Sequence, residues 1–158
     1  MQIQTIRATI HSLLVECDIP CEFAPFDHDL YQACVDEAIR RGYPVVGDHS
    51  VRTFLRLGVC YGATAGGYLN RPTQIWLALY TSSALYIDEI PFCFRSEMPN
   101  MYPFNDRFIG GQQQGNAVLD AFADLIRRAS DLYQPIPSKL IMTSSLNFVT
   151  ANLLEHET

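Results

Sequence analysis

The sequence predicts an all-α fold in a single domain that covers residues 1–158. Three observations lead to this prediction. Apolar residues recur in several long segments with the period of three to four that is typical of amphipathic helices. No segment shows the two-residue alternation of a half-buried strand. Prolines and glycines stand between the periodic segments, and 48% of the residues are hydrophobic, which is enough apolar material for a packed core.

The periodic segments predict six helices, each bounded by turn-forming residues. They span residues 2–16, 28–41, about 50–62, 73–90, 116–133 and 138–156. Asp48 or Ser50 is expected to cap the third helix, because both side chains can accept a hydrogen bond from a free backbone N–H. Gly62, Gly66 and Gly67 follow. They predict a flexible linker between the third and fourth helices.

The fourth predicted helix is the most apolar. Arg71-Pro72 opens it, since proline is well placed in the first turn of a helix. Residues 73–90 contain no helix breaker and carry apolar side chains around the whole axis, which is typical of a central, buried helix. Pro91 is expected to end this helix. The proline-containing and glycine-containing residues 91–111 are expected to form loops.

Charge and composition restrict the function. The net charge of −6 and the pI of about 5.0 argue against a nucleic-acid partner and against a polybasic membrane patch. The longest near-apolar stretch, residues 75–87, is shorter than the roughly 20 residues that a membrane span needs. Residues 1–15 lack the pattern of a signal peptide. The five cysteines are odd in number and irregular in spacing, so we expect a cytoplasmic protein with reduced thiols.

An acidic pair stands at the end of the apolar fourth helix. Asp88 and Glu89 follow a long apolar run, where a buried carboxylate must be paired, protonated or bound to a metal. Negative charge is also disfavoured at a helix C-terminus. Hard oxygen ligands in such a place suit Mg²⁺, which takes one or two carboxylates together with waters and phosphate oxygens. The alternative is that the two acids mark the helix end at the surface and pair with Arg95.

Other motifs are incomplete. Residues 62–67 are rich in glycine but lack the Lys-Ser/Thr pair of a Walker loop. Residues 27–31 begin like a calcium loop but lack its glycine, and they are better interpreted as a helix N-terminus. Cys17, Cys21 and His28 lack a fourth zinc ligand at sensible spacing. The histidines show no catalytic triad pattern.

The segment around the acidic pair resembles the aspartate-rich helix end of class I terpenoid synthases. The residues that carry the resemblance are Leu85-Tyr86-Ile87-Asp88-Glu89-Ile90-Pro91-Phe92. The segments that follow are similar to trichodiene synthase and its fungal relatives. They are Tyr102-Pro103-Phe104-Asn105-Asp106, Gly111-Gln112, Val118-Leu119-Asp120-Ala121-Phe122 and Ser144-Ser145-Leu146-Asn147-Phe148. The similarity is collinear from about residue 50 onward, and it implies an isoprenoid-synthase-type helical bundle.

The resemblance also implies a chemistry. It is that of a sesquiterpene cyclase, a lyase that ionises farnesyl diphosphate or a related prenyl diphosphate with Mg²⁺. Asp88 matches the first aspartate of the motif, a metal ligand and catalytic residue. Glu89 matches the second acid, which is a metal ligand or a salt-bridge partner. Phe92 stands where a third acid is expected, which weakens the site. The residues expected to line the substrate pocket are Trp76, Tyr80, Tyr86, Phe92 and Phe148. The alternative for each aromatic ring is packing in the core.

The sequence matches only the first half of such a domain. The second metal motif, N-D-x-x-S-x-x-x-E, is absent, and its nearest counterparts are Asn105-Asp106 and Asn147. Half a bundle leaves apolar helix faces uncovered, so a homodimer or a completing chain is expected. Two hypotheses follow. One is a terpene cyclase that is truncated or completed by another chain. The other is a non-catalytic relic, or a helical protein that binds isoprenoids or other partners.

Overall fold

The computed structural model describes residues 2–18 and 25–156. Within these two ranges every regular element is helical and no strand occurs, which confirms the predicted all-α fold. The elements are α1 (Gln2–Glu16), α2 (His28–Arg40), α3 (Leu55–Thr64), α4 (Arg71–Cys93), the 3₁₀ turn η1 (Arg95–Glu97), α5 (Met98–Met101), α6 (Phe104–Ile109), α7 (Ala117–Leu132) and α8 (Pro135–His156).

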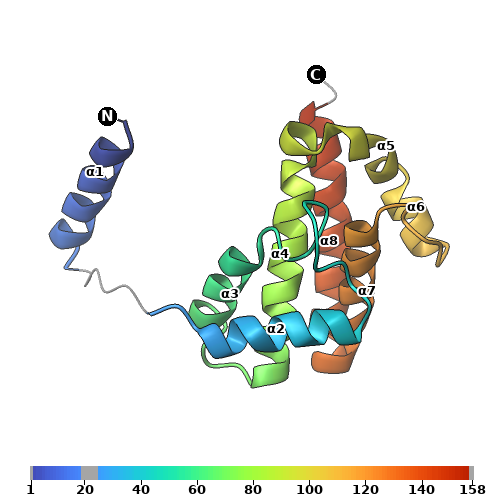
Figure 1. Ribbon diagram of the computed structural model, residues 1–158, viewed down its shortest axis with the longest axis horizontal. Coiled ribbons are helices and arrows are strands. Elements are labelled where there is room, and N and C mark those ends of the chain that lie inside the picture. Colours follow the sequence, from blue (N-terminus) through green and yellow to red (C-terminus); the bar gives the residue numbers. More distant parts are fainter. Residues whose placement is uncertain (1, 19–24, 157–158) are drawn as a thin grey trace.

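Helix α4 lies at the centre of the bundle, as its apolar circumference predicted. It contacts α2, α3, α7 and α8. Figure 1 shows α8 running alongside α4 and α2 crossing it. The side chain of Asn70 caps α4 by accepting a hydrogen bond from the backbone N–H of Thr73 at 3.0 Å, and Pro72 occupies the first turn. The indole N–H of Trp76 donates to the carbonyl oxygen of Leu125 at 2.9 Å, which fixes α4 against α7.

Helix α3 begins later than predicted. Its first residue is Leu55, because residues 51–54 form turns that are not yet helical. The hydroxyl of Thr53 donates to the carbonyl oxygen of Asp48 at 2.7 Å and so stabilises these turns. No side chain caps α3, and the expected cap by Asp48 or Ser50 was therefore wrong.

Gly62 is a packing residue and not part of a linker. It lies inside α3, is buried, and faces α4. A Cβ atom at this position would come within 3.1 Å of the carbonyl oxygen of Gln74. The absence of a side chain therefore allows α3 and α4 to approach closely. The predicted linker is confined to the residues between Thr64 and Arg71.

Pro91 does not end the central helix. Helix α4 continues to Cys93, because a proline so close to the end of a helix removes a single backbone hydrogen bond. The N–H of Phe94 still bonds to the carbonyl oxygen of Ile90 at 3.1 Å and completes the last turn. The expected loop over residues 91–111 is for the most part a series of short helical segments, formed by η1, α5 and α6.

Helix α8 packs both polar and apolar side chains against the bundle. Ser138, Ser145, Val149 and Asn152 are buried, and the partly buried Ile141, Leu146 and Phe148 pack against the core. Three large apolar side chains are more than half exposed: Ile136, Leu140 and Leu154. At 100° per residue these three side chains share one face of the helix. We call this surface the outer face of α8.

Helix α1 has the predicted length, and Figure 1 shows it apart from the bundle. Its apolar residues do not enter the core. Ile6, Ile10 and Leu13 are all more than half exposed. The amphipathic pattern therefore correctly predicted a helix, but this helix leaves its apolar side chains uncovered.

Candidate active-site groove

An apolar groove of about 340 Å³ lies between α3, α4 and α8. Helix α4 contributes one stripe of side chains with three-to-four-residue spacing: Leu77, Tyr80, Thr81, Ala84, Leu85 and Asp88. Tyr61 of α3 and Phe148 of α8 complete the lining. Asp88 is the only ionisable carboxylate among these residues, and it closes the stripe on the side toward the C-terminus of α4. The groove is therefore an apolar surface with one acidic end.

Tyr80 is held in a fixed position in the groove wall. Its ring stacks on Trp76 with 5.0 Å between centroids. Its hydroxyl lies 2.8 Å from the hydroxyl of Ser145 on α8, and Ser145 donates in turn to the carbonyl oxygen of Ile141 at 2.7 Å. Because the one hydroxyl hydrogen of Ser145 is used in that bond, Tyr80 acts as the donor. Burial raises the pKa of Tyr80, so its phenol stays protonated at neutral pH.

The two acids of the predicted motif point in different directions. Asp88 is exposed and lines the groove, whereas Glu89 is half-buried and lies outside it. Neighbouring residues on a helix do not face one another. Glu89 instead accepts a hydrogen bond from the thiol of Cys93, one turn further on, at 3.3 Å. The structure contains no ion pair between either acid and Arg95 within the residues that it describes.

The prediction that the acidic pair is buried at the end of the helix is wrong for Asp88. Asp88 reaches solvent, so its charge needs no buried partner. The residue stands five positions before the end of α4, since this helix extends past Pro91. What distinguishes Asp88 is its place at the end of an apolar groove, with carboxylate oxygens that are accessible to a ligand.

The predicted pocket aromatics occupy four different environments. Tyr80 and Phe148 line the groove. Trp76 is 6% exposed and supports the groove from behind by its stacking on Tyr80. Tyr86 is fully buried elsewhere in the core, and Phe92 is 70% exposed one turn beyond Asp88.

Tyr86 belongs to a polar network. Its hydroxyl lies 2.6 Å from Nδ1 of His49 and accepts a hydrogen bond from the side-chain amide of Asn116 at 3.3 Å. The same amide donates to the carboxylate of Glu97 at 2.8 Å. These contacts tie α4 to η1 and to the start of α7. Tyr86 therefore organises the core, and its ring does not reach the groove.

No preformed metal cluster stands in the described part of the chain. Within residues 2–18 and 25–156, no group of three or more His, Cys, Asp or Glu side chains is placed to hold a metal ion. Cys21, one of the weighed zinc ligands, lies outside the described residues. In the same part of the chain, no helix is both long enough and apolar enough to cross a membrane.

Five lining residues were not predicted from the sequence: Tyr61, Leu77, Thr81, Ala84 and Leu85. A signal for the four on α4 was present, because counting back from Asp88 in steps of three to four residues reaches them. Tyr61 lies on α3 and had no such signal.

Comparison with known proteins identifies the relatives of this chain, although no protein-family model matches it. The chain is 27% identical over 155 residues to the alpha-cuprenene synthase COP6 of Coprinopsis cinerea. It is 30% identical over 129 residues to the terpene synthase BipA of Cochliobolus sativus, and 30% identical over 109 residues to the longiborneol synthase CLM1 of Gibberella zeae. The relatives of this chain are fungal terpene synthases.

These terpene synthases are longer than the region that they share with the chain. The match covers 96% of this chain but 47% of the alpha-cuprenene synthase. It covers 80% of this chain and 37% of BipA, and 69% of this chain and 31% of the longiborneol synthase. The chain thus spans less than half the length of these relatives. Its described helices form a terpene-synthase-like partial bundle, as the sequence predicted.

Proposed function

We propose that this chain supplies the first wall of a class I terpene synthase active site of the trichodiene synthase type. The observation that carries the proposal is the groove between α3, α4 and α8 with Asp88 at its acidic end. The similarity to fungal terpene synthases supports it. The substrate that we propose is farnesyl diphosphate or a related prenyl diphosphate.

The groove suits an isoprenoid chain. Its walls are apolar and aromatic apart from Asp88 and Thr81. Burial of hydrocarbon against such walls is favourable by about 25 cal/mol for each Å² that leaves water. The volume of about 340 Å³ lies near the lower end of the range for small-molecule sites, roughly 300–1,000 Å³. We therefore propose that the groove holds part of the isoprenoid chain, and that a second wall encloses the rest.

Asp88 fits a magnesium ligand better than Glu89 does. Mg²⁺ keeps several waters and usually takes one or two carboxylates together with substrate phosphates, so a single exposed carboxylate is an adequate protein contact. Asp88 is exposed at the groove end, whereas Glu89 is turned away and accepts the hydrogen bond from Cys93. We propose Asp88 as the ligand and Glu89 as a residue that supports this end of α4. When bound, Mg²⁺ neutralises charge on the diphosphate and makes it a better leaving group.

The chain's own side chains then have two tasks. Asp88 would hold the metal at one end of the groove, where the diphosphate end of the substrate would lie. The apolar stripe of α4 excludes water from the allylic cation that forms when the carbon–oxygen bond breaks. Tyr80 of α4 and Phe148 of α8 both line the groove, and aromatic rings attract positive charge.

The outer face of α8 supports the need for a second wall. Ile136, Leu140 and Leu154 are exposed there, on a helix whose other side packs against the bundle. The part of each relative that the match does not cover is long enough to add such a wall. The completing part can be a further segment, another chain or a second copy. Within the described residues, one groove wall with one carboxylate, that of Asp88, is present.

The same observations support the alternative of isoprenoid binding without turnover by this chain alone. The apolar groove is present, but no cluster of three metal-ligating side chains occurs in the described residues. We therefore expect the isolated chain to bind a prenyl diphosphate weakly and to leave it intact. Turnover is expected only when the second wall is supplied.

An assay of volatile hydrocarbons tests the proposal. The chain alone, and a fusion of the chain to the uncovered part of the alpha-cuprenene synthase, are incubated with farnesyl diphosphate and Mg²⁺. We expect hydrocarbon from the fusion only, and a loss of about 100-fold or more in the fusion with Asp88→Asn. Asp106→Asn, an exposed carboxylate on α6, is the matched control and is expected to have no effect. A folded fusion whose turnover is unchanged by Asp88→Asn would refute the proposed role.

A further inference from the structure

A second cavity lies on a different face of α4 from the groove. It has a volume of about 350 Å³ and is enclosed by α2, α4 and α7. Its apolar floor consists of Ile75, Trp76 and Leu79 of α4 with Leu125 and Leu132 of α7. None of these residues lines the groove. We call this cavity the arginine cleft, because of the side chains at its rim.

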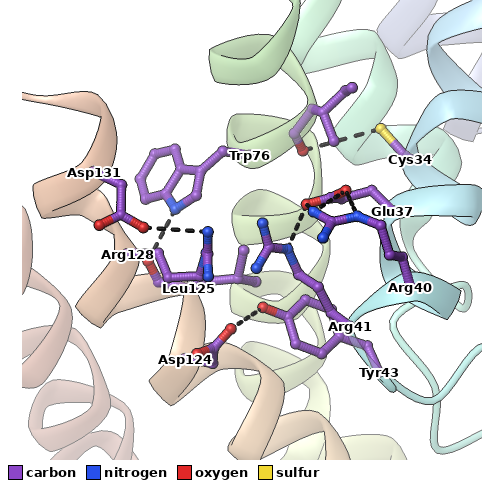
Figure 2. Close-up of polar contacts among 11 residues, drawn as sticks. Cys34, Glu37, Arg40, Arg41, Tyr43, Trp76, Asp124, Leu125, Arg128 and Asp131 are labelled. Carbon is purple, nitrogen blue, oxygen red and sulfur yellow. Dashed lines mark hydrogen bonds and ion pairs between the residues drawn. The ribbon is translucent and has the colours of Figure 1, made fainter.

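Three arginines converge on the arginine cleft from two helical segments. Arg40 and Arg41 stand at the end of α2, and Arg128 lies on α7. Figure 2 shows Arg128 beside the indole of Trp76, and Arg40 and Arg41 beside Glu37. The same three arginines also line an adjoining recess of about 500 Å³. The chain as a whole carries a net charge of −6, so three arginines at one place form a local exception to its acidic character.

The carboxylates at the rim neutralise these arginines only in part. Glu37 accepts hydrogen bonds from Arg40 at 2.7 and 2.8 Å, and it also accepts one from Nε of Arg41. Arg128 forms an ion pair with Asp131 at 3.2 Å. Among the residues that line the cleft itself, three guanidinium groups therefore stand with two carboxylates.

Arg41 carries the least compensated of these charges. Its side chain is 16% exposed, and its Nε contact goes to a carboxylate that it shares with Arg40. Its two terminal nitrogens donate to no other residue in the described part of the chain. A guanidinium group has five N–H donors, so the terminal donors of Arg41 remain available to an acceptor on a ligand in the cleft.

The charge of the surroundings limits what this anion can be. Beyond the rim, Asp120 and Asp124 line the adjoining recess, and Asp124 accepts a hydrogen bond from the hydroxyl of Tyr43. Glu37 and Asp131 also remain at the rim. A group with several negative charges, such as a diphosphate, would be repelled by these carboxylates. A single carboxylate adds the least negative charge beside these acids, and its two oxygens match the planar fork of a guanidinium group.

We propose that the arginine cleft binds a small monocarboxylate with an apolar body. The headgroup is held by Arg41 and Arg128, and the body packs on Trp76 and its apolar neighbours. The cleft volume of about 350 Å³ fits such a ligand and lies within the usual range of small-molecule pockets, roughly 300–1,000 Å³. This ligand site lies on another face of α4 from the prenyl groove, so it does not depend on the function proposed above.

The single tryptophan of the chain reports on the cleft, because Trp76 forms part of its floor. The whole chain is titrated with octanoate at pH 7, and the tryptophan fluorescence is recorded. Octanol and octylamine are the matched controls, with the same apolar body and a neutral or positive head. We expect a saturable change with octanoate and none with the two controls. An equal response to octanol would show simple apolar partition and would overturn the proposal.

Two variants with opposite expected effects complete the test. Arg41→Gln is expected to weaken octanoate binding by about tenfold, the effect of losing one charged hydrogen-bond partner. Glu37→Gln removes the competing carboxylate and is expected to strengthen binding several-fold. A misfolded variant cannot produce that gain. Arg56→Gln, whose guanidinium group lies over the ring of Phe26 away from the cleft, is the charge-matched control. Binding that is unaffected by both Arg41→Gln and Glu37→Gln would overturn the proposal.

Discussion

Gly58 of α3 lies against the backbone of Ala78 of α4, so closely that a Cβ atom on Gly58 would come within 2.2 Å of the carbonyl oxygen of Ala78. The contact fixes the distance between the two helices that form one side of the groove. The position of Tyr61 relative to α4 therefore depends on a residue that has no side chain.

Gly58→Ala is expected to destabilise the protein by about 1–3 kcal/mol, because the added methyl group forces the two backbones apart. Urea unfolding followed by circular dichroism measures the change. Gly110→Ala is the matched control, since a Cβ atom there would meet nothing nearer than the carbonyl oxygen of Asp106 at 3.2 Å on an exposed turn. Equal stability of Gly58→Ala and the parent chain would contradict the close packing of α3 on α4.

Tyr80→Phe is expected to cost about 1 kcal/mol, the typical net value of one hydrogen bond. Tyr80→Phe removes only the hydrogen bond between the hydroxyls of Tyr80 and Ser145, because Ser145 still donates to the carbonyl oxygen of Ile141. Since both changes remove the same contact, the effects of Tyr80→Phe and Ser145→Ala are expected to be less than additive in the double variant. Additive free energies of unfolding would show that the two hydroxyls are not coupled.

The stability of the fold is expected to fall in alkaline solution because of Cys34. Burial raises the pKa of this thiol from 9.0 to about 12, so the folded state holds the proton more tightly than the unfolded state does. The contribution of the protonated Cys34 thiol to the free energy of unfolding is complete below pH 9. It is lost as the pH rises from 9 to about 12. One such group changes the free energy of unfolding by at most about 1.4 kcal/mol per pH unit. Buried tyrosines such as Tyr43, whose pKa is also raised, act in the same direction at higher pH.

Unfolding in urea at several pH values between 8 and 10 checks this prediction. Cys34→Ala is the comparison, because it lacks the thiol while keeping the surrounding core residues. Its free energy of unfolding is expected to fall less steeply with pH than that of the parent chain. Parallel pH dependences would show that Cys34 does not carry the effect.

The outer face of α8 is expected to drive self-association of the isolated chain. Leu140 and Leu154 are 63% and 62% exposed on this face. Sedimentation velocity should show dimers or larger species, and Leu140→Lys with Leu154→Lys should shift the distribution toward monomer. Ile10→Lys on α1 tests whether the exposed apolar side chains of that helix contribute instead. A compact monomer of the parent chain at high concentration would contradict this prediction.

The local sequence pattern was sufficient to predict the helices whose apolar residues recur at helical spacing along the chain. The apolar circumference of residues 73–90 correctly placed α4 at the centre, and turn-forming residues marked most helix boundaries. The pattern failed where a long-range contact decides the outcome. Gly62 resembles a linker residue locally, but α4 makes it a packing residue. At Pro91 the pattern failed for a local reason, because a proline so near the end of a helix removes a single backbone hydrogen bond and α4 continues to Cys93.

The groove residues on α4 could be predicted from their spacing, whereas contacts between residues of different helices could not. Asp88 and Tyr80 lie on one stripe of α4, which the spacing alone indicates. The burial of Tyr86 among His49 and Asn116 depends on residues far away in the sequence. The arginine cleft could not be predicted either, since Arg41 and Arg128 belong to different segments and neither stands in a recognisable motif.

The most direct test of the central claim maps where a prenyl diphosphate binds to the isolated chain. Backbone and methyl NMR spectra are recorded with farnesyl diphosphate in the presence and absence of Mg²⁺. The claim predicts shifts at groove residues such as Leu77, Leu85 and Phe148, with a magnesium-dependent shift at Asp88 that Asp88→Asn removes. Shifts confined to the arginine cleft, or shifts that do not depend on Mg²⁺ and Asp88, would contradict it.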